Sequence, residues 1–306
     1  MSQSIAQTTL INHWIGGASS QAAPIRTGPV WNPATGLQLA EVNFATVADI
    51  DHAVATAKMA YPGWRKTPLS RRSEILFNFR NLIDQNRQRL AEIVSTENGK
   101  TLADAHGEIA RGLENVEFAC GIAALLKGSY SEQASTGVDV YQIRQPIGVV
   151  AGITPFNFPV MVPLWMLSNA IACGNTFILK PSEKVPSASL LLAELAHQAG
   201  VPDGVLNVVQ GDRVAVERLL SHPDIRAISF VGSTPVAKSI YETGTRSGKR
   251  VQALGGAKNH MLVLPDADVD AAADAAVSAA YGAAGQRCMA ISVIVAVGIS
   301  FRQMPF

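Results

Sequence analysis

The sequence predicts an α/β fold, with a parallel sheet that carries helices on both faces. Three observations predict it. Short apolar runs typical of buried strands alternate with helical patterns between residues 147 and 244. Hydrophobic residues make up 48% of the chain and charged residues 16%, so a large core can be buried. The length of 306 residues corresponds to about two domains.

The N-terminal part predicts strands first and helices afterwards. The first 45 residues are rich in turn formers around short apolar runs, which is typical of strands and loops. Apolar residues then recur at helical spacing after Thr46, a residue type that caps helices. The predicted helices cover residues 46–61, 69–100 and 104–128. We expect Ser70 to open the second of these, and the helix to end near Gly99.

The alternating pattern comes next. Residues 138–154 predict two strands separated at Pro146. The sheet strands are expected at 147–154, 175–180, 204–211 and 227–232, with helices at 161–172, 187–200, 215–221 and 235–244. This order favours a parallel sheet with helices on both faces. Beyond it, we expect a strand at 260–265, an alanine-rich helix at 268–285 and a buried strand at 291–298.

The composition and the motifs give no support for a nucleic-acid partner, a membrane partner or a metal site. The formal net charge of +1 argues for neither a nucleic acid nor a membrane surface. No apolar run approaches the length of a membrane span, and the N-terminus lacks the pattern of a secretory signal. Three cysteines and six scattered histidines match no metal-ligand spacing, so no metal is expected. A reducing cytoplasmic location fits this cysteine usage.

Cys288 lies in the segment GAAGQRCMAIS, after a run of small residues. It is either a nucleophile or a small apolar side chain in a core. Since buried cysteine is common and inert, the residues alone favour the second role. Cys120 and Cys173 lie in apolar surroundings, and we expect both to be core residues.

Polar residues follow two of the predicted strands. Ser233 and Thr234 suit an N-cap and Pro235 suits the first turn, so the free N–H groups of that helix would face a phosphate. An ordinary capped helix explains the same residues, and the glycine-rich dinucleotide fingerprint is absent. Lys180 and Glu183 suit the two hydroxyls of an adenosine ribose, or else form a solvated surface pair.

Asn157 follows another strand, within the motif PFNFP. A polar amide in so apolar a setting needs a hydrogen-bond partner. Either its NH2 group donates to an oxyanion, or its side chain caps the next helix.

Five motifs occur in one order along the chain: PFNFP, LKPSEKVP, FVGSTPVAKSI, LGGAKNH and GQRC. Together they resemble the NAD(P)-dependent aldehyde dehydrogenase superfamily, over nearly the whole chain. More narrowly, GGAKNH, GQRCMA, TPFNFP and HPDIRAISFVGS are similar to the CoA-acylating methylmalonate-semialdehyde dehydrogenases. The resemblance implies an aldehyde dehydrogenase-like fold, with a doubly wound NAD-binding domain and an α/β catalytic domain.

The resemblance changes the role expected of Cys288, which becomes the nucleophile. Its thiolate attacks the aldehyde carbonyl, hydride leaves for the nicotinamide, and a thioester remains. Asn157 and the backbone N–H of Cys288 would stabilise the oxyanion. The adjacent Arg287 would favour the thiolate.

The family pattern also implies an NAD site. The residues at its contact positions are Thr154, Phe156, Lys180, Glu183, Lys184, Ser233 and Gly255. Of these, Lys180 and Glu183 would hold the adenosine ribose, and Ser233 would meet the pyrophosphate. A carboxylate at Glu183 disfavours a 2′-phosphate, so NAD is expected rather than NADP.

Ala253 stands where hydrolytic members typically carry a glutamate that activates water to cleave the thioester. Alanine cannot take a proton, so the thioester should persist until coenzyme A, a thiol, attacks it. Methylmalonate and malonate semialdehyde would then give propanoyl-CoA and acetyl-CoA. In the alternative, Ala253 is only a strand residue and water attack is assisted elsewhere, as in a hydrolytic semialdehyde dehydrogenase.

Both substrates carry a carboxylate, which arginine binds bidentately. By resemblance, Arg111 and Arg287 are the candidates. The residues alone favour a surface ion pair for Arg111, with Glu108 or Glu114 at helical spacing. Neither the residues nor the resemblance distinguishes the two substrates, or valine breakdown from inositol breakdown.

The resemblance also divides the chain into parts. Residues 1–134 and 148–254 would form the NAD-binding domain, 135–147 an oligomerisation hairpin, and 255–306 the start of the catalytic domain. Family members continue well beyond the nucleophile, which implies a C-terminally truncated chain with exposed apolar surface. Full-length members are expected to be homo-oligomers. For this chain, the alternative is an inactive fragment that binds NAD without turnover.

Overall fold

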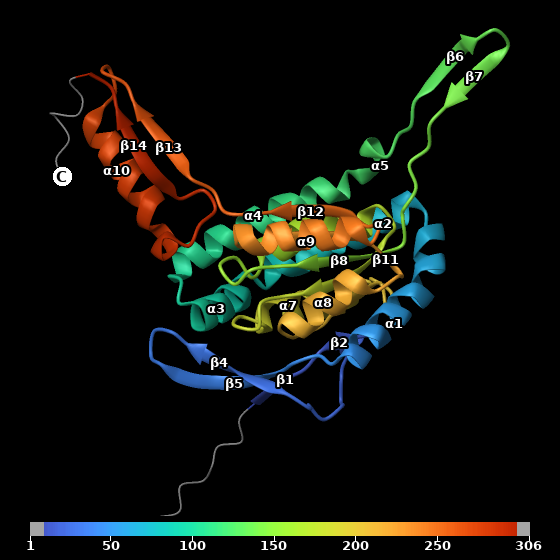
Figure 1. Ribbon diagram of the computed structural model, residues 1–306, viewed down its shortest axis with the longest axis horizontal. Helices are drawn as coiled ribbons and strands as arrows, with labels where there is room; N and C mark the ends of the chain where they lie inside the picture. The colour runs from blue at the N-terminus through green and yellow to red at the C-terminus, as the bar shows by residue number, and fades with distance from the viewer. Residues whose placement is uncertain (1–8, 299–306) are drawn as a thin grey trace, which may run out of the picture.

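A computed structural model describes residues 9–298 (Figure 1). A seven-stranded sheet lies at its centre. In spatial order, its strands are β12 (Arg250–Leu254), β11 (Ile225–Val231), β8 (Val149–Ile153), β9 (Thr176–Lys180), β10 (Leu206–Val208), β2 (Trp14–Ile15) and β3 (Ala18–Ser19). The strands from β12 to β10 are parallel, whereas β2 and β3 pair antiparallel at one edge.

Helices cover both faces of this sheet. One apolar cluster joins it to α1 (Val47–Lys66), α8 (Arg213–Ser221) and α9 (Thr234–Arg246). Another joins it to α2 (Leu69–Gln85), α3 (Arg87–Asn98), α4 (Leu102–Cys120), α6 (Met161–Ala172) and α7 (Ser187–Gln198). Alternate residues of β8 divide between them, with Val149 and Ala151 in the first cluster and Val150 in the second. The predicted doubly wound sheet is therefore confirmed.

The start of α1 follows from its sequence. Thr46 Oγ1 accepts from the Asp49 backbone N–H at 3.2 Å, and an Asp49 carboxylate oxygen accepts from the Thr46 N–H at 2.8 Å. This reciprocal pair is a capping box. The helix continues past its predicted end at Tyr61, through Pro62, to Lys66.

The single helix predicted over residues 69–100 was wrong, because α2 and α3 are separate helices that meet at Asn86. The Asn86 side chain donates to the Leu82 carbonyl at 2.8 Å. Such a bond to the preceding turn competes with continuation of the helix. The apolar period persists across the break, so periodicity does not reveal it. Gly99, with φ of 83°, ends α3 as expected.

Two further segments were predicted with different limits. The pattern over residues 104–128 forms α4 and a short α5 (Ile122–Leu125), which meet at Gly121. The hairpin expected at 135–147 consists of β6 (Tyr130–Ser135) and β7 (Val138–Tyr141). Its first strand, YSEQAS, is polar and exposed, so it carries no apolar signal. The hairpin extends away from the central sheet (Figure 1), and its role in oligomerisation stays a prediction.

The remaining strands form two peripheral sheets. Near the N-terminus, β1 (Thr9–Ile11), β5 (Leu37–Asn43) and β4 (Thr27–Asn32) form a three-stranded sheet. At the other end, β13 (Asn259–Val263) and β14 (Ile291–Ala296) pair in parallel beside α10 (Val269–Tyr281) and a 3₁₀ turn (Gly282–Gly285).

This C-terminal group leaves large apolar side chains exposed, among them Leu262 at 68% and Leu264 at 54%. The expected exposed apolar surface is therefore present within the described residues. The last part of the region predicted as 255–306 lies outside them, as do the first eight residues of the segment predicted as 1–134. Among the described helices, none has the length and apolar character needed to cross a membrane.

Candidate active site

The predicted cofactor residues gather at the carboxyl edge of the parallel sheet. Strands β8 and β9 end side by side there, with Ile153 paired to Lys180, and Ile153 is also paired to Phe230 of β11. In open α/β sheets, this edge is where ligands bind. The fold therefore brings the segments that follow four strands, beginning at residues 154, 181, 232 and 255, to one side of the molecule.

Thr154 and Phe156 lie in the segment after β8. The Thr154 backbone N–H donates to the Lys180 carbonyl at 3.1 Å. Its hydroxyl is buried and has no hydrogen-bond partner among the described residues. The Phe156 carbonyl accepts from the Asn98 amide at 3.0 Å. The orphaned hydroxyl of Thr154 is a free polar group that suits a polar ligand.

Lys180 is the last residue of β9, and Glu183 and Lys184 follow this strand. The Lys180 ammonium lies 3.2 Å from a Glu183 carboxylate oxygen, and only the glutamate is substantially exposed. Burial lowers the pKa of Lys180, while Glu183 opposes that effect. Since Lys180 is buried, the pair is not the solvated surface pair considered from sequence. The Lys184 ammonium lies 5.0 Å from the centroid of the Phe156 ring.

Ser233 and Gly255 meet at the N-terminus of α9. Ser233 is the N-cap, yet its exposed side chain makes no capping hydrogen bond. The Thr234 hydroxyl instead accepts from the Gly256 N–H at 3.0 Å. A Cβ at Gly255 would lie only 3.0 Å from the same hydroxyl. The chain can therefore pass this close to the first turn of α9 only because residue 255 is glycine. The first N–H groups of α9 and the Ser233 hydroxyl suit a phosphate, so the residues present fit a dinucleotide.

Cys288 lies between the 3₁₀ turn and β14, and its side chain is exposed. The Asn259 amide holds this segment by donating to the carbonyls of Cys288 at 2.8 Å and Ala290 at 3.0 Å. The other two cysteines are less exposed, and burial raises the pKa of the Cys120 thiol to about 11 and also raises the pKa of Cys173. A thiol with a raised pKa is a poor nucleophile at neutral pH. The expectation that Cys120 is a core residue is confirmed, and Cys173 is half-buried.

Asn157 contacts the same segment as Cys288. Its Nδ2 donates to the Gln286 carbonyl at 2.8 Å, across 129 positions of sequence. Its buried Oδ1 accepts no hydrogen bond from the described residues. Asn157 does not cap the helix that follows it. Val160 is the N-cap residue of α6, and its side chain makes no capping hydrogen bond.

One pocket of about 410 Å³ brings the predicted nucleophile and both predicted arginines together. It is lined by Cys288, Arg287 and Met289 from one side and by Arg111 from α4. The ion pair expected between Arg111 and Glu108 is not formed. Glu108 is buried and pairs with Lys100 at 2.6 Å, whereas Arg111 is exposed to the pocket.

Sequence reasoning missed Lys100 as a residue of this site and misplaced Glu108 on the surface. Both line the Cys288 pocket, and the Lys100 ammonium lies 3.8 Å from the centroid of the Phe158 ring. Burial lowers the pKa of Lys100, against the opposing effect of Glu108. No local pattern predicts this pair, because it is buried only when α6 packs on α4.

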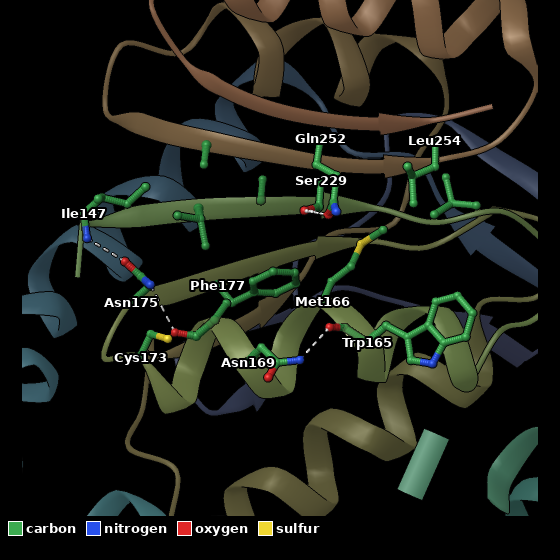
Figure 2. Close-up of a pocket in the computed structure, with 15 residues that line it drawn as sticks. Ile147, Trp165, Met166, Asn169, Cys173, Asn175, Phe177, Ser229, Gln252 and Leu254 are labelled. Carbon is green, nitrogen blue, oxygen red and sulfur yellow. Dashed lines mark hydrogen bonds between the residues drawn. The ribbon is translucent and has the colours of Figure 1, made fainter. Parts of the chain in front are cut away.

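A second pocket, of about 510 Å³, lies on the sheet face between α6 and β12 (Figure 2). Its walls are mainly apolar, and Ser229 and Gln252 form a hydrogen bond of 3.4 Å across neighbouring strands there. Trp165 of α6 lines both pockets, but Cys288 and the two arginines line only the pocket of about 410 Å³. Within residues 9–298, no three His, Cys, Asp or Glu side chains gather as a metal site would require.

The chain is similar to known proteins along most of its length. The aldehyde dehydrogenase family matches residues 20–300. A malonate-semialdehyde dehydrogenase of Pseudomonas aeruginosa is 57% identical over 273 residues, which are 89% of this chain and 55% of that protein. Malonate-semialdehyde dehydrogenase 1 of Geobacillus kaustophilus is 52% identical over 298 residues, covering 97% of this chain and 61% of the relative.

Solved structures show the same similarity. A putative methylmalonate-semialdehyde dehydrogenase of Sinorhizobium meliloti, complexed with NAD, superimposes with a TM-score of 0.95 at 51% identity, over 97% of this chain and 61% of its own. The methylmalonate-semialdehyde dehydrogenase of Oceanimonas doudoroffii gives 0.94 at 50% identity, over 96% and 60%. The chain thus spans about three-fifths of the length of these relatives. It belongs to the aldehyde dehydrogenase family.

Proposed function

We propose that this chain carries the NAD-binding and nucleophile-bearing part of a CoA-acylating semialdehyde dehydrogenase that acts on methylmalonate and malonate semialdehyde. The single observation that supports it best is the pocket in which Cys288, Arg111 and Arg287 meet. The names of the relatives point to the same substrates. The exposed thiol supplies a nucleophile, and the two guanidinium groups supply positive charge for a carboxylate.

In the proposed reaction, the Cys288 thiolate attacks the aldehyde carbon, and the carbonyl electron pair moves to the oxygen. Asn157 Nδ2 has two N–H groups, so one can donate to this oxyanion while the other keeps its bond to Gln286. Bound NAD would accept the hydride that leaves the thiohemiacetal carbon. The substrate's carboxyl group then leaves as CO2, and the electron pair of the broken C–C bond forms the enolate of the thioester. The α-carbon takes a proton from solvent, so a propanoyl or acetyl group remains on Cys288 as a thioester.

The cofactor would lie along the carboxyl edge of the sheet. Lys180 and Glu183 would bind the adenosine ribose, and Ser233 with the N-terminus of α9 would bind the pyrophosphate. The further contacts would come from Thr154, Phe156, Lys184 and Gly255. Glu183 supports NAD over NADP, because its carboxylate would repel a 2′-phosphate.

Transfer of the acyl group to coenzyme A is supported by Ala253. This residue lies on β12 and packs against the apolar cluster of the α8 and α9 face, so it supplies no base for water. Among the described residues, the carboxyl groups that line the Cys288 pocket are Asp104 and Glu108, and Glu108 is paired with Lys100. Asp104 is exposed, which keeps hydrolysis assisted by that carboxylate as a second candidate.

The test follows NADH formation by the purified chain from methylmalonate semialdehyde, with and without coenzyme A. Sustained NADH formation that requires coenzyme A and disappears in Cys288→Ser is expected. Free acid formed without coenzyme A would favour the hydrolytic candidate, and loss of it in Asp104→Asn would identify the base. NAD binding by calorimetry with no turnover would show that this chain is an inactive NAD-binding fragment.

A further inference from the structure

We propose that the buried pair Lys100–Glu108 positions Asn157 for the oxyanion, so that both are positioning residues of the reaction. This inference rests on the function proposed above. Neither residue follows from the resemblance, which places only Asn157 and Cys288 at the reacting carbonyl.

Glu108 uses its two oxygens for two different groups. One oxygen lies 2.6 Å from the Lys100 ammonium. The other accepts from the backbone N–H groups of Val160 at 2.7 Å and Met161 at 3.1 Å. These N–H groups belong to the first turn of α6, which has no side-chain cap of its own. A carboxylate from α4 therefore caps α6 and complements its positive end.

Lys100 holds the chain on the other side of this cap. Its ammonium lies 3.8 Å from the Phe158 ring centroid, a distance typical of a cation–π contact. The neighbouring Asn98 donates to the Phe156 carbonyl at 3.0 Å. Asn157 thus lies between Phe156, whose carbonyl is held from the end of α3, and Phe158, whose ring is held from the α3–α4 connection. Since an oxyanion donor must lie within a few tenths of an ångström of its position, these contacts set the donor's geometry.

The pair is almost completely buried. The Glu108 side chain has no exposed surface and that of Lys100 has 3%. Each charge is compensated by the other and by further hydrogen bonds or the aromatic ring, as a buried pair requires. The pair is also neutral as a whole, so it leaves the positive charge of Arg111 and Arg287 in the same pocket available to a substrate carboxylate.

The first arm of the test is amide hydrogen exchange on the full chain, which needs no turnover. In Glu108→Ala, the amides of Val160 and Met161 should exchange at least about tenfold faster, while β10 stays unchanged. The double variant Lys100→Met/Glu108→Gln removes both charges but keeps an acceptor oxygen, and it should restore slow exchange. Glu114→Gln, an exposed carboxylate on the same helix, is the matched control. Unchanged exchange in folded Glu108→Ala would overturn the proposal.

The second arm measures turnover with propanal, which has no carboxylate. Glu108→Ala should lower kcat about 10²-fold, as loss of an oxyanion donor does, with little change in KM. Because Glu108 acts through Asn157, Glu108→Ala/Asn157→Ala should be no slower than Asn157→Ala alone. Multiplied losses would contradict the proposal. If the wild-type chain forms no NADH, the proposed function fails for this chain, and the exchange arm alone decides whether the pair holds the segment that follows Asn157.

Discussion

Arg111→Ala tests whether the Cys288 pocket selects a carboxylated aldehyde. Arg111 lines the same pocket of about 410 Å³ as Cys288 and Arg287. Hydrogen bonds to charged groups contribute about 1.5–3 kcal/mol each. Since Arg111 is exposed, we take the low end of that range, about 1.5 kcal/mol, and this corresponds to a roughly tenfold change in an equilibrium constant.

The expected result is therefore an increase of about tenfold in KM for methylmalonate semialdehyde, with KM for propanal little changed. Arg111→Lys keeps the charge but loses the bidentate fork, so it should give an intermediate KM. Arg213→Ala is the matched control, because that arginine is 88% exposed and pairs with Glu217 on α8. The assay is initial-rate NADH formation with each aldehyde. Equal losses on both aldehydes would refute the assigned role of Arg111.

Three more predictions concern the cofactor site and the fold. Glu183→Ala should raise the calorimetric Kd for NAD at least about tenfold, whereas Glu194→Ala should not; equal affinities would remove Glu183 from the site. Thr46→Ala removes the capping box of α1 and should lower the free energy of unfolding in urea by about 1 kcal/mol. Burial raises the pKa of Glu97 from 4.5 to about 7. Between these pH values the unfolded chain has released the proton that the folded chain still binds. The free energy of unfolding should therefore fall as the pH rises from 4.5 to about 7, by at most about 3 kcal/mol. Glu97→Gln should abolish that part of the loss, and identical pH profiles would contradict the assignment.

Local sequence patterns predicted helices and strands correctly where one pattern corresponds to one helix or one strand. The apolar runs that became β8 and β9 are buried along their length, as strands covered on both faces must be. The break at Asn86, where the side chain donates to the Leu82 carbonyl, was missed because the apolar period continues across it. The strand Tyr130–Ser135 was missed because an exposed polar strand has no periodic signal.

Site residues could be predicted from the sequence only where the residue type itself indicates a chemical role. From the residues alone, Cys288 favoured a core role, and the family resemblance was needed to name it as the nucleophile. The bond between Asn157 and Gln286 joins residues 129 positions apart, so it exists only once the fold is formed. The same holds for Lys100 and Glu108. Their spacing of eight residues suggests no contact, and the pair depends on the first turn of α6.

Mass spectrometry of the chain after incubation with NAD and methylmalonate semialdehyde, in the absence of coenzyme A, tests the proposed chemistry most directly. Omitting coenzyme A should leave a propanoyl group on the peptide that contains Cys288, with about one NADH formed per adduct. Later addition of coenzyme A should remove the group as propanoyl-CoA. NADH formation with Cys288 unmodified, or an acyl group on Cys120 or Cys173 instead, would contradict the assignment of Cys288 as the nucleophile.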